Sequence, residues 1–235
     1  MLVRTKAIVL NAIRYQEKSL IVKCFTRESG LKSYFVHSAF SAKNKKISYF
    51  QPLTLLAIEA SHKNKGTLET LKEIALAVPY QTISSDVIKS TIAIFVSELL
   101  HHSIREEEPN ENLFDFLETA LRWLDTHEET ANFHLILTLH MTRFLGFYPD
   151  VTDLPAPFFD LKEGRFESLC GIDCLSEQET MLLRKLLGLK FSGSQKIFNA
   201  SERQTLLRIL LDYYQLHLEG FRRPKSADVL REVFA

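Results

Sequence analysis

Cations and aromatic side chains are interleaved along the first part of the chain, between Arg4 and Lys46. Lysine and arginine pair with phosphates, and aromatic rings stack on bases without reading their identity. Both residue types in one stretch are what sequence-independent binding of a nucleic acid strand requires. The cations are Arg4, Lys6, Arg14, Lys18, Lys23, Arg27, Lys32, Lys43, Lys45 and Lys46, and the aromatics are Tyr15, Phe25, Tyr34, Phe35 and Phe40.

The charge of the chain is strongly divided between its two parts. Residues 1–80 hold 13 Lys+Arg and 5 Asp+Glu, a balance of +8, whereas the remainder carries −8, so that the whole chain is neutral. A basic module joined to an acidic one predicts a polyanionic partner for the first.

A solvated basic face with aromatics in the core would have the same composition. Phe25 and Phe35 alternate with polar neighbours, which predicts that they belong to the core. Tyr15 and Tyr34 remain as the predicted stacking residues. Lys43, Lys45 and Lys46 are the predicted principal phosphate contacts, because a loop tip has no structural need for three cations.

A second basic cluster, Arg222, Arg223 and Lys225, lies near the end of the chain. It has two interpretations. It is a further DNA contact, useful for holding two strands at once, or it is an exposed turn before a helix.

Other chemistries find no support in the sequence. The chain has no phosphate-binding GxxxxGK[ST] loop, HExxH, GxSxG or GxGxxG motif, so we expect no enzyme and no cofactor. Three cysteines argue against a disulfide framework and favour the cytoplasm. No apolar run is long enough to span a membrane, and no signal peptide is expected.

The elements that would position the basic residues are short strands. Residues 19–26 and 31–37 are rich in β-branched and aromatic types around the turn RESG, which predicts a hairpin. Residues 3–10 and 47–60 are further strands. Residues 67–77 have Leu68, Leu71 and Ile74 at a spacing that favours a helix, but a closed barrel needs a fifth strand and we place it here. Five such strands within about eighty residues predict a small closed barrel of the OB-fold type.

Beyond residue 80 the pattern becomes helical. The predicted fold class is α+β, an OB-fold barrel over 1–80 followed by a mostly helical domain over 81–235 with a hairpin near 158–168. Expected helices cover 86–103, 113–124, 132–145, 176–188 and 201–218, with a short one at the end. Predicted N-terminal caps are Ser176 with Glu179, Ser201 with Gln204, and Ser226.

Four stretches, in order along the chain, are similar to the RecO family of bacterial recombination mediators. They are YQEKSLIVKCFTRESGLKSY, QPLTLLAIE, LTLHMTRFLGFYPD and HLEGFRRPKSADVL. The resemblance implies binding of single- and double-stranded DNA, annealing of complementary strands, and a location at the nucleoid. It also implies work with RecR, and often RecF, to load RecA onto strands coated by single-strand binding protein. The acidic C-terminal tail of that protein would need a cation, for which Lys185, Arg143 and Arg208 are open alternatives.

The chain departs from the family in one respect. Many members carry a four-cysteine zinc site after the Leu-Gly-aromatic helix, whereas this region offers only Cys170 and Cys174. A structural zinc site requires four nitrogen or sulfur ligands. We therefore expect no metal, with the LKEGRF hairpin held by packing.

Two rival interpretations remain from the residues alone. The basic barrel would serve equally as an interaction module for an acidic protein that never contacts DNA. It would also suit RNA, because stacking and phosphate contacts do not read the sugar.

Overall fold

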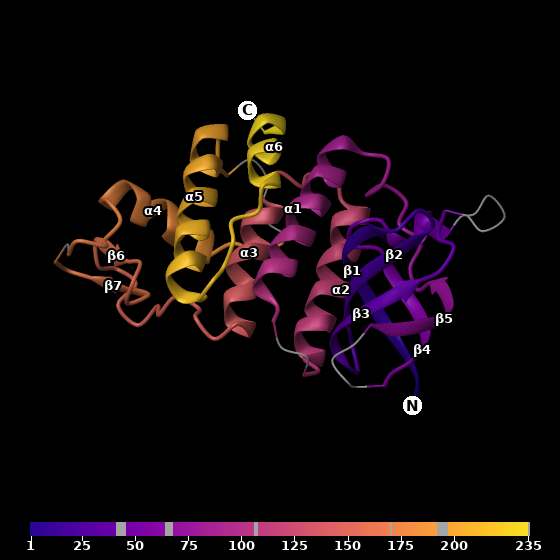
Figure 1. Cartoon of the computed structure of the whole chain (residues 1–235). Helices are drawn as coiled ribbons and strands as arrows, with labels where there is room; N and C mark the ends of the chain where they lie inside the picture. Colours follow the sequence, from indigo (N-terminus) through magenta and orange to yellow (C-terminus); the bar gives the residue numbers. More distant parts are fainter. Residues whose placement is uncertain (41–45, 64–67, 106–107, 170, 192–196, 235) are drawn as a thin grey trace. The chain divides into compact units, whose positions relative to one another are not determined.

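Five strands form a closed barrel at the start of the chain (Figure 1). The computed structural model describes residues 1–40, 46–63, 68–105, 108–169, 171–191 and 197–234. The order around the barrel is β1-β2-β3-β5-β4, and β4 pairs back to β1. All pairs are antiparallel except β3 with β5. This is the five-stranded arrangement expected of an OB-fold, and the strand over 67–77 is confirmed as β5. The strands are β1 (Leu2–Tyr15), β2 (Ser19–Thr26), β3 (Gly30–Val36), β4 (Leu55–Ser61) and β5 (Glu69–Leu76).

Strand β1 is longer than predicted because it serves two neighbours in turn. Its first half pairs with β4 up to Ile8, and its second half pairs with β2 from Ala7 to Tyr15. The register shifts between Val9 and Asn11. Such a bulge bends a strand, which allows β1 to close the barrel.

The strand predicted over 47–60 is only partly correct. A 3-10 helix, η1 (Lys46–Phe50), occupies its first part, and β4 begins at Leu55. Between them Pro52 lacks a backbone N–H and Leu53 has a φ of +60°. Neither residue can continue a strand at that point.

Six helices and a short hairpin follow the barrel in the described ranges. The helices are α1 (Val87–Ser103), α2 (Glu111–Thr126), α3 (Phe133–Phe144), α4 (Glu177–Leu187), α5 (Ala200–His217) and α6 (Ser226–Val233). The hairpin is β6 (Phe158–Asp160) with β7 (Arg165–Glu167), as predicted.

Two of the predicted helix caps are wrong. The predicted Ser176–Glu179 capping box is present at α4. At α5, however, the box is made by Asn199 and Glu202, two residues before the predicted pair. Ser226 is the first residue of α6 and not its cap, because the helix begins one residue earlier than predicted and Lys225 occupies the cap position.

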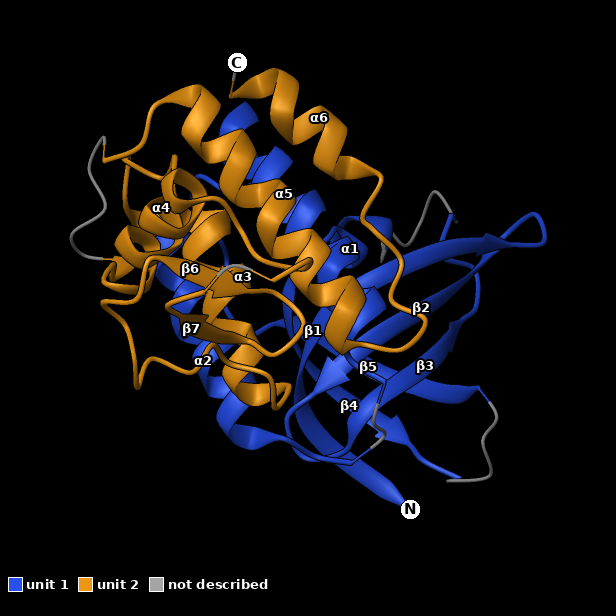
Figure 2. Cartoon of the chain, turned by 90° about the vertical axis from the view of Figure 1, so that its left-hand side faces the viewer, with its two compact units in different colours: residues 1–125 blue, residues 126–235 orange. Residues whose placement is uncertain are grey.

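The chain divides into two compact units, 1–125 and 126–235, coloured separately in Figure 2. Helices α1 and α2 therefore belong with the barrel, and the first unit extends well beyond residue 80. Within the second unit the hairpin packs through Phe159 and Phe166 against Leu183 of α4 and Tyr213 of α5. This apolar cluster holds the hairpin, as expected.

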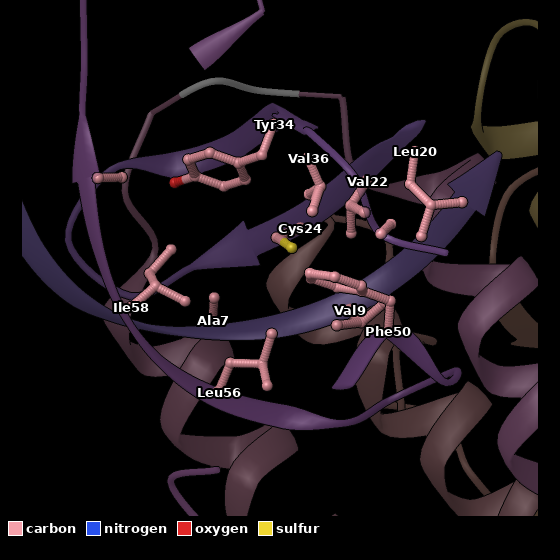
Figure 3. Close-up of a cluster of buried hydrophobic side chains, with 12 residues drawn as sticks. Ala7, Val9, Leu20, Val22, Cys24, Tyr34, Val36, Phe50, Leu56 and Ile58 are labelled. Carbon is pink, nitrogen blue, oxygen red and sulfur yellow. The ribbon is translucent and has the colours of Figure 1, made fainter. Parts of the chain in front are cut away.

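Inward-facing residues of the barrel strands form the core of the first unit (Figure 3). Leu20, Val22 and Cys24 of β2 meet Tyr34 and Val36 of β3 there. Burial raises the pKa of the Cys24 thiol to about 12. The thiol is a core group and is protonated at neutral pH.

Candidate nucleic-acid interface

The outer face of β1, β2 and β3 carries a row of exposed or half-buried rings. Phe35 lies opposite Ile21, which lies opposite Ile13, so these three side chains share one row across the sheet. The Tyr15 ring meets the Phe35 ring edge-on at 5.8 Å, and Phe35 meets His37 at 4.4 Å. Because side chains at i and i+2 point to the same side of a strand, the three rings lie on one face. We call Ile13, Tyr15, Ile21, Lys23, Ser33, Phe35 and His37 the ring platform.

Lys23 supplies a cation to this platform. It lies between Asn11 and Ser33 in the next row of the sheet. Partial burial lowers its pKa, since the charged form loses hydration. His101, at the C-terminal turn of α1, also has a lowered pKa, mainly through burial and secondarily through the charge of Lys23. None of the seven platform residues carries a carboxylate, so an approaching phosphate meets no repulsion from them.

The structure exchanges the predicted roles of two neighbouring aromatics. Tyr34 is fully buried in the barrel, where its hydroxyl lies 2.9 Å from His62 Nε2. Phe35 is half-buried on the outer face. The prediction that Tyr34 stacks on bases is therefore wrong, and so is the placing of Phe35 in the core. Alternation separates the two faces of β3 but does not say which face is inside.

Phe25 was correctly predicted to be buried, although it does not face the barrel interior. Its ring packs against Phe114 of α2 at 5.9 Å, on the outer side of the barrel. Helix α2 thus covers the outer face of β2 at Phe25, two residues beyond Lys23 of the ring platform.

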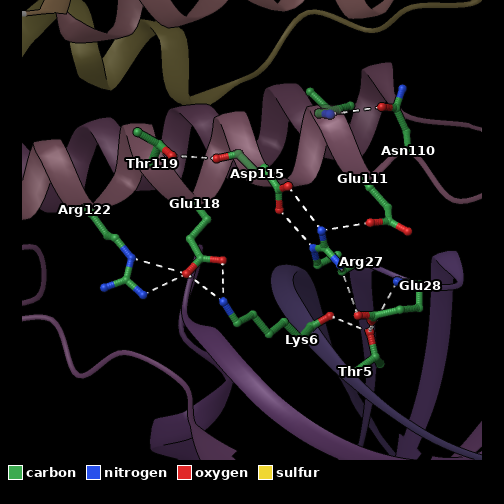
Figure 4. Close-up of polar contacts among 11 residues, drawn as sticks. Thr5, Lys6, Arg27, Glu28, Asn110, Glu111, Asp115, Glu118, Thr119 and Arg122 are labelled. Carbon is green, nitrogen blue, oxygen red and sulfur yellow. Dashed lines mark hydrogen bonds and ion pairs between the residues drawn. The ribbon is translucent and has the colours of Figure 1, made fainter.

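Lys6 and Arg27, two of the predicted DNA contacts, bind carboxylates of α2 (Figure 4). Lys6 Nζ donates to both oxygens of Glu118 at 2.9 and 2.8 Å. Arg27 donates to both oxygens of Asp115 at 2.9 and 3.2 Å and pairs with Glu111 at 2.8 Å. These ion pairs attach α2 to the barrel, and they leave both cations engaged within the unit.

The electrostatics of these pairs agree with that role. Burial disfavours ionisation of Glu118, but the hydrogen bonds from Lys6 and Arg122 outweigh it and hold the pKa of Glu118 below its usual value. The hydrogen bond from Arg27 likewise lowers the pKa of Asp115. Both carboxylates are therefore charged at neutral pH, as ion pairing requires.

Arg14 lies at the edge of the platform. Its guanidinium is 4.9 Å from the centre of the Phe40 ring, and its Nη2 donates to the Glu17 carbonyl at 3.0 Å. Lys18 is exposed in the same turn between β1 and β2. In OB-folds the face of strands 2 and 3 and the loop joining strands 1 and 2 are the usual ligand surface. Arg14 and Lys18 therefore flank the ring platform on the expected side.

The remaining predicted contacts are dispersed. Arg4 pairs with Glu59 at 2.7 Å on the β1–β4 side. Lys32 lies opposite Cys24 at the other end of β3. Lys43 and Lys45, together with the side chain of Lys46, lie outside the described residues.

In the second unit, the predicted cluster near the end of the chain is exposed. Arg223 donates to Gln215 at 2.6 Å and pairs with Asp212. Arg222 and Lys225 are exposed beside it. The engagement of Arg223 with α5 fits the interpretation of a turn before a helix, and the DNA interpretation stays a prediction.

Sequence reasoning missed Phe35 and His37 as members of the platform. A signal in the sequence would have found Phe35. Apolar residues occupy alternate positions on both strands of the hairpin, namely 20, 22 and 24 on the first strand and 34 and 36 on the second. Fixing that set as the interior places 21, 23, 33, 35 and 37 outside.

Comparison with known proteins agrees with this architecture. Residues 1–80 match the family described as "Recombination protein O N terminal", and residues 84–227 match "Recombination protein O C terminal". The chain belongs to the RecO family. It is 60% identical to the "DNA repair protein RecO" of Flavobacterium johnsoniae, 41% to that of Christiangramia forsetii and 32% to that of Porphyromonas gingivalis, each alignment covering all of both chains.

Membership places the OB barrel and the ring platform in a family of DNA repair proteins. Within the portion that the structure describes, no three metal-ligating side chains gather into a cluster, and no helix is long and apolar enough to cross a membrane. In this chain the barrel brings Tyr15, Phe35 and His37 together with Lys23 on one sheet face.

Proposed function

We propose that the chain binds single-stranded DNA along the ring platform and anneals complementary strands. The observation that carries this proposal is the set of Tyr15, Phe35 and His37 on one sheet face with Lys23, in a chain of the RecO family. Stacked bases and neutralised phosphates are the two interactions that sequence-independent strand binding uses. Neutralising the phosphates lowers the repulsion between two strands and lets them pair.

The proposal extends to the partners that the resemblance implies. With RecR, and with RecF where it takes part, the chain would assist loading of RecA onto DNA coated by single-strand binding protein. The tail of that protein would bind in the helical region. In that region Arg208 pairs with Glu179 and Asp212, and Arg143 lies 4.1 Å from the Tyr148 ring. Lys185, in the last turn of α4, is the third of these cations.

Salt dependence gives a direct test of DNA binding. Arg14, Lys18 and Lys23 with the three lysines at 43, 45 and 46 make six cations. Because each phosphate contact on a single strand contributes about −0.7, we expect log affinity to fall against log salt with a slope of about −4. A slope near zero would refute phosphate binding, and an unchanged slope after Lys43, Lys45 and Lys46 are changed to Glu would remove those lysines from the site.

Two further assays address annealing and the rival protein-binding role. Complementary oligonucleotides should anneal faster with the chain present, both bare and coated by single-strand binding protein. If the chain binds an acidic protein but unrelated single-stranded DNA neither binds at low salt nor displaces that protein, the interaction-module interpretation holds in place of ours.

A further inference from the structure

The mouth of the barrel holds a pocket beside the ring platform. Its volume is about 480 Å³, within the range of small-molecule sites. Leu20 of β2 and Phe50 of η1, both buried, belong to its apolar lining. Barrel mouths are a common location for such sites.

Gln51, after η1, also lines this pocket and carries a side-chain amide. That amide has no hydrogen-bond partner within the described ranges. The β1 bulge, between Val9 and Asn11, sets the register in which Ala12 and Arg14 face the same side as Leu20 and Val22. An amide offers both a donor and an acceptor, which is the pairing that the edge of a nucleobase needs.

Arg14 joins the pocket to the ring platform. Along β1, Ala12 and Arg14 lie on the side of the pocket, whereas Ile13 and Tyr15 lie on the side of the platform. Arg14 and the Phe40 ring, which is 37% exposed, are both part of the pocket lining. A guanidinium at this border can hold the phosphate of a nucleotide whose base leaves the platform.

We infer that the barrel mouth is a pocket for one unstacked nucleobase of the strand that crosses the ring platform. The base would lie in the apolar part against Phe40, its edge would bond to Gln51, and its phosphate would pair with Arg14. This inference rests on the proposed DNA binding and adds a subsite to it. An apolar peptide side chain is the competing occupant. The amide of Gln51 and the continuity with the ring platform favour a base.

The test compares an ordinary single-stranded oligonucleotide with one of equal length built from abasic nucleotides. Ala12→Met fills the pocket with a flexible apolar chain and keeps every cation and every platform ring. Since one stacked base is worth about 1–3 kcal/mol, we expect Ala12→Met to weaken binding of the ordinary strand by roughly 5- to 150-fold. On the abasic strand the variant and the unaltered chain should bind alike.

A second variant separates loss of the pocket from loss of the fold. Gln51→Leu changes an exposed residue at the rim and should weaken only the ordinary strand, while the urea midpoint stays unchanged. Equal binding of the ordinary strand by both variants and the unaltered chain would overturn the inference and favour a peptide occupant. Equal weakening on both strands would overturn it as well. Failure of the unaltered chain to bind the ordinary strand would instead refute the proposed function.

Discussion

Asp125 holds the segment that leaves the barrel, and its loss should be costly. The carboxylate is buried at the end of α2 and accepts backbone N–H groups of Gln81, Thr82 and Ile83 at 2.8 to 3.1 Å. Lys89 Nζ adds a buried hydrogen bond to the Asp125 carbonyl at 3.0 Å. These bonds tie the connection after β5 to helix α2 within one unit.

The magnitude follows from the donors that would be left without a partner. A buried unsatisfied donor costs about 1–3 kcal/mol, and hydrogen bonds to charged groups lie at the upper end. Gln81 is exposed and its N–H can turn to water, whereas Ile83 is buried. Asp125→Ala should therefore lower the free energy of unfolding by about 3 kcal/mol, and Asp125→Asn by about half of that.

The measurement is urea unfolding followed by tryptophan fluorescence. Trp123 is the one tryptophan of the chain and lies two residues from Asp125, so its emission reports on this unit. Asp115→Ala, on the same helix, is the matched control. Its carboxylate is 55% exposed, and its loss should cost at most about 1 kcal/mol. Equal midpoints for Asp125→Ala and the unaltered chain would refute the reasoning.

The same carboxylate predicts a pH dependence. Burial opposes ionisation of Asp125, but the backbone hydrogen bonds outweigh it and lower its pKa. A group with a lowered folded-state pKa stabilises the fold above its unfolded pKa of about 4 and loses that contribution as the pH falls. Stability of the unaltered chain should therefore decline below about pH 5, and the decline should be shallower in Asp125→Ala. Parallel acid profiles would contradict this assignment.

Three further outcomes test other parts of the structure. Lys6→Met should lower the free energy of unfolding by about 1 kcal/mol, because it removes a partner of Glu118, and should change DNA affinity by less than twofold. A large loss of affinity would show that Lys6 contacts DNA. Gly164→Ala should lower stability by about 1–3 kcal/mol in a circular-dichroism melt, because φ is +68° and the new Cβ would lie 2.6 Å from the Tyr213 hydroxyl; an unchanged melt would contradict it. Because Cys24 is buried and protonated, Cys24→Ser should not change the number of thiols that a thiol reagent modifies in the native chain at pH 8, but should reduce that number by one in urea. A reduction in the native chain would show that Cys24 is accessible.

Features that depend on neighbouring residues were predictable from the sequence. The hairpin turn at Gly30, the capping box at Ser176 and the turn at Gly164 each depend on a few consecutive positions, and the structure has all three. The fifth strand was also placed, because a barrel of this kind needs it to close.

Features that depend on distant partners were not predictable. Lys6 and Arg27 read as phosphate contacts in the sequence, because nothing local shows that Glu118 and Asp115 lie about a hundred positions away on a helix that packs there. The partner of the buried Tyr34 hydroxyl, His62, is likewise distant in the sequence. The ring platform can be assigned once the side of β3 that faces the barrel interior is known.

The affinity of the chain for single-stranded DNA after loss of the platform rings tests the central claim most directly. Tyr15→Leu and Phe35→Leu keep apolar cover and remove the stacking surface, while Lys162→Gln removes an exposed cation from the turn between β6 and β7 in the second unit. Each leucine variant should weaken binding of an oligonucleotide at fixed salt by roughly 5- to 150-fold, and Lys162→Gln by less than about twofold. Equal affinities for the unaltered chain and both leucine variants would contradict the ring platform as the DNA-binding surface.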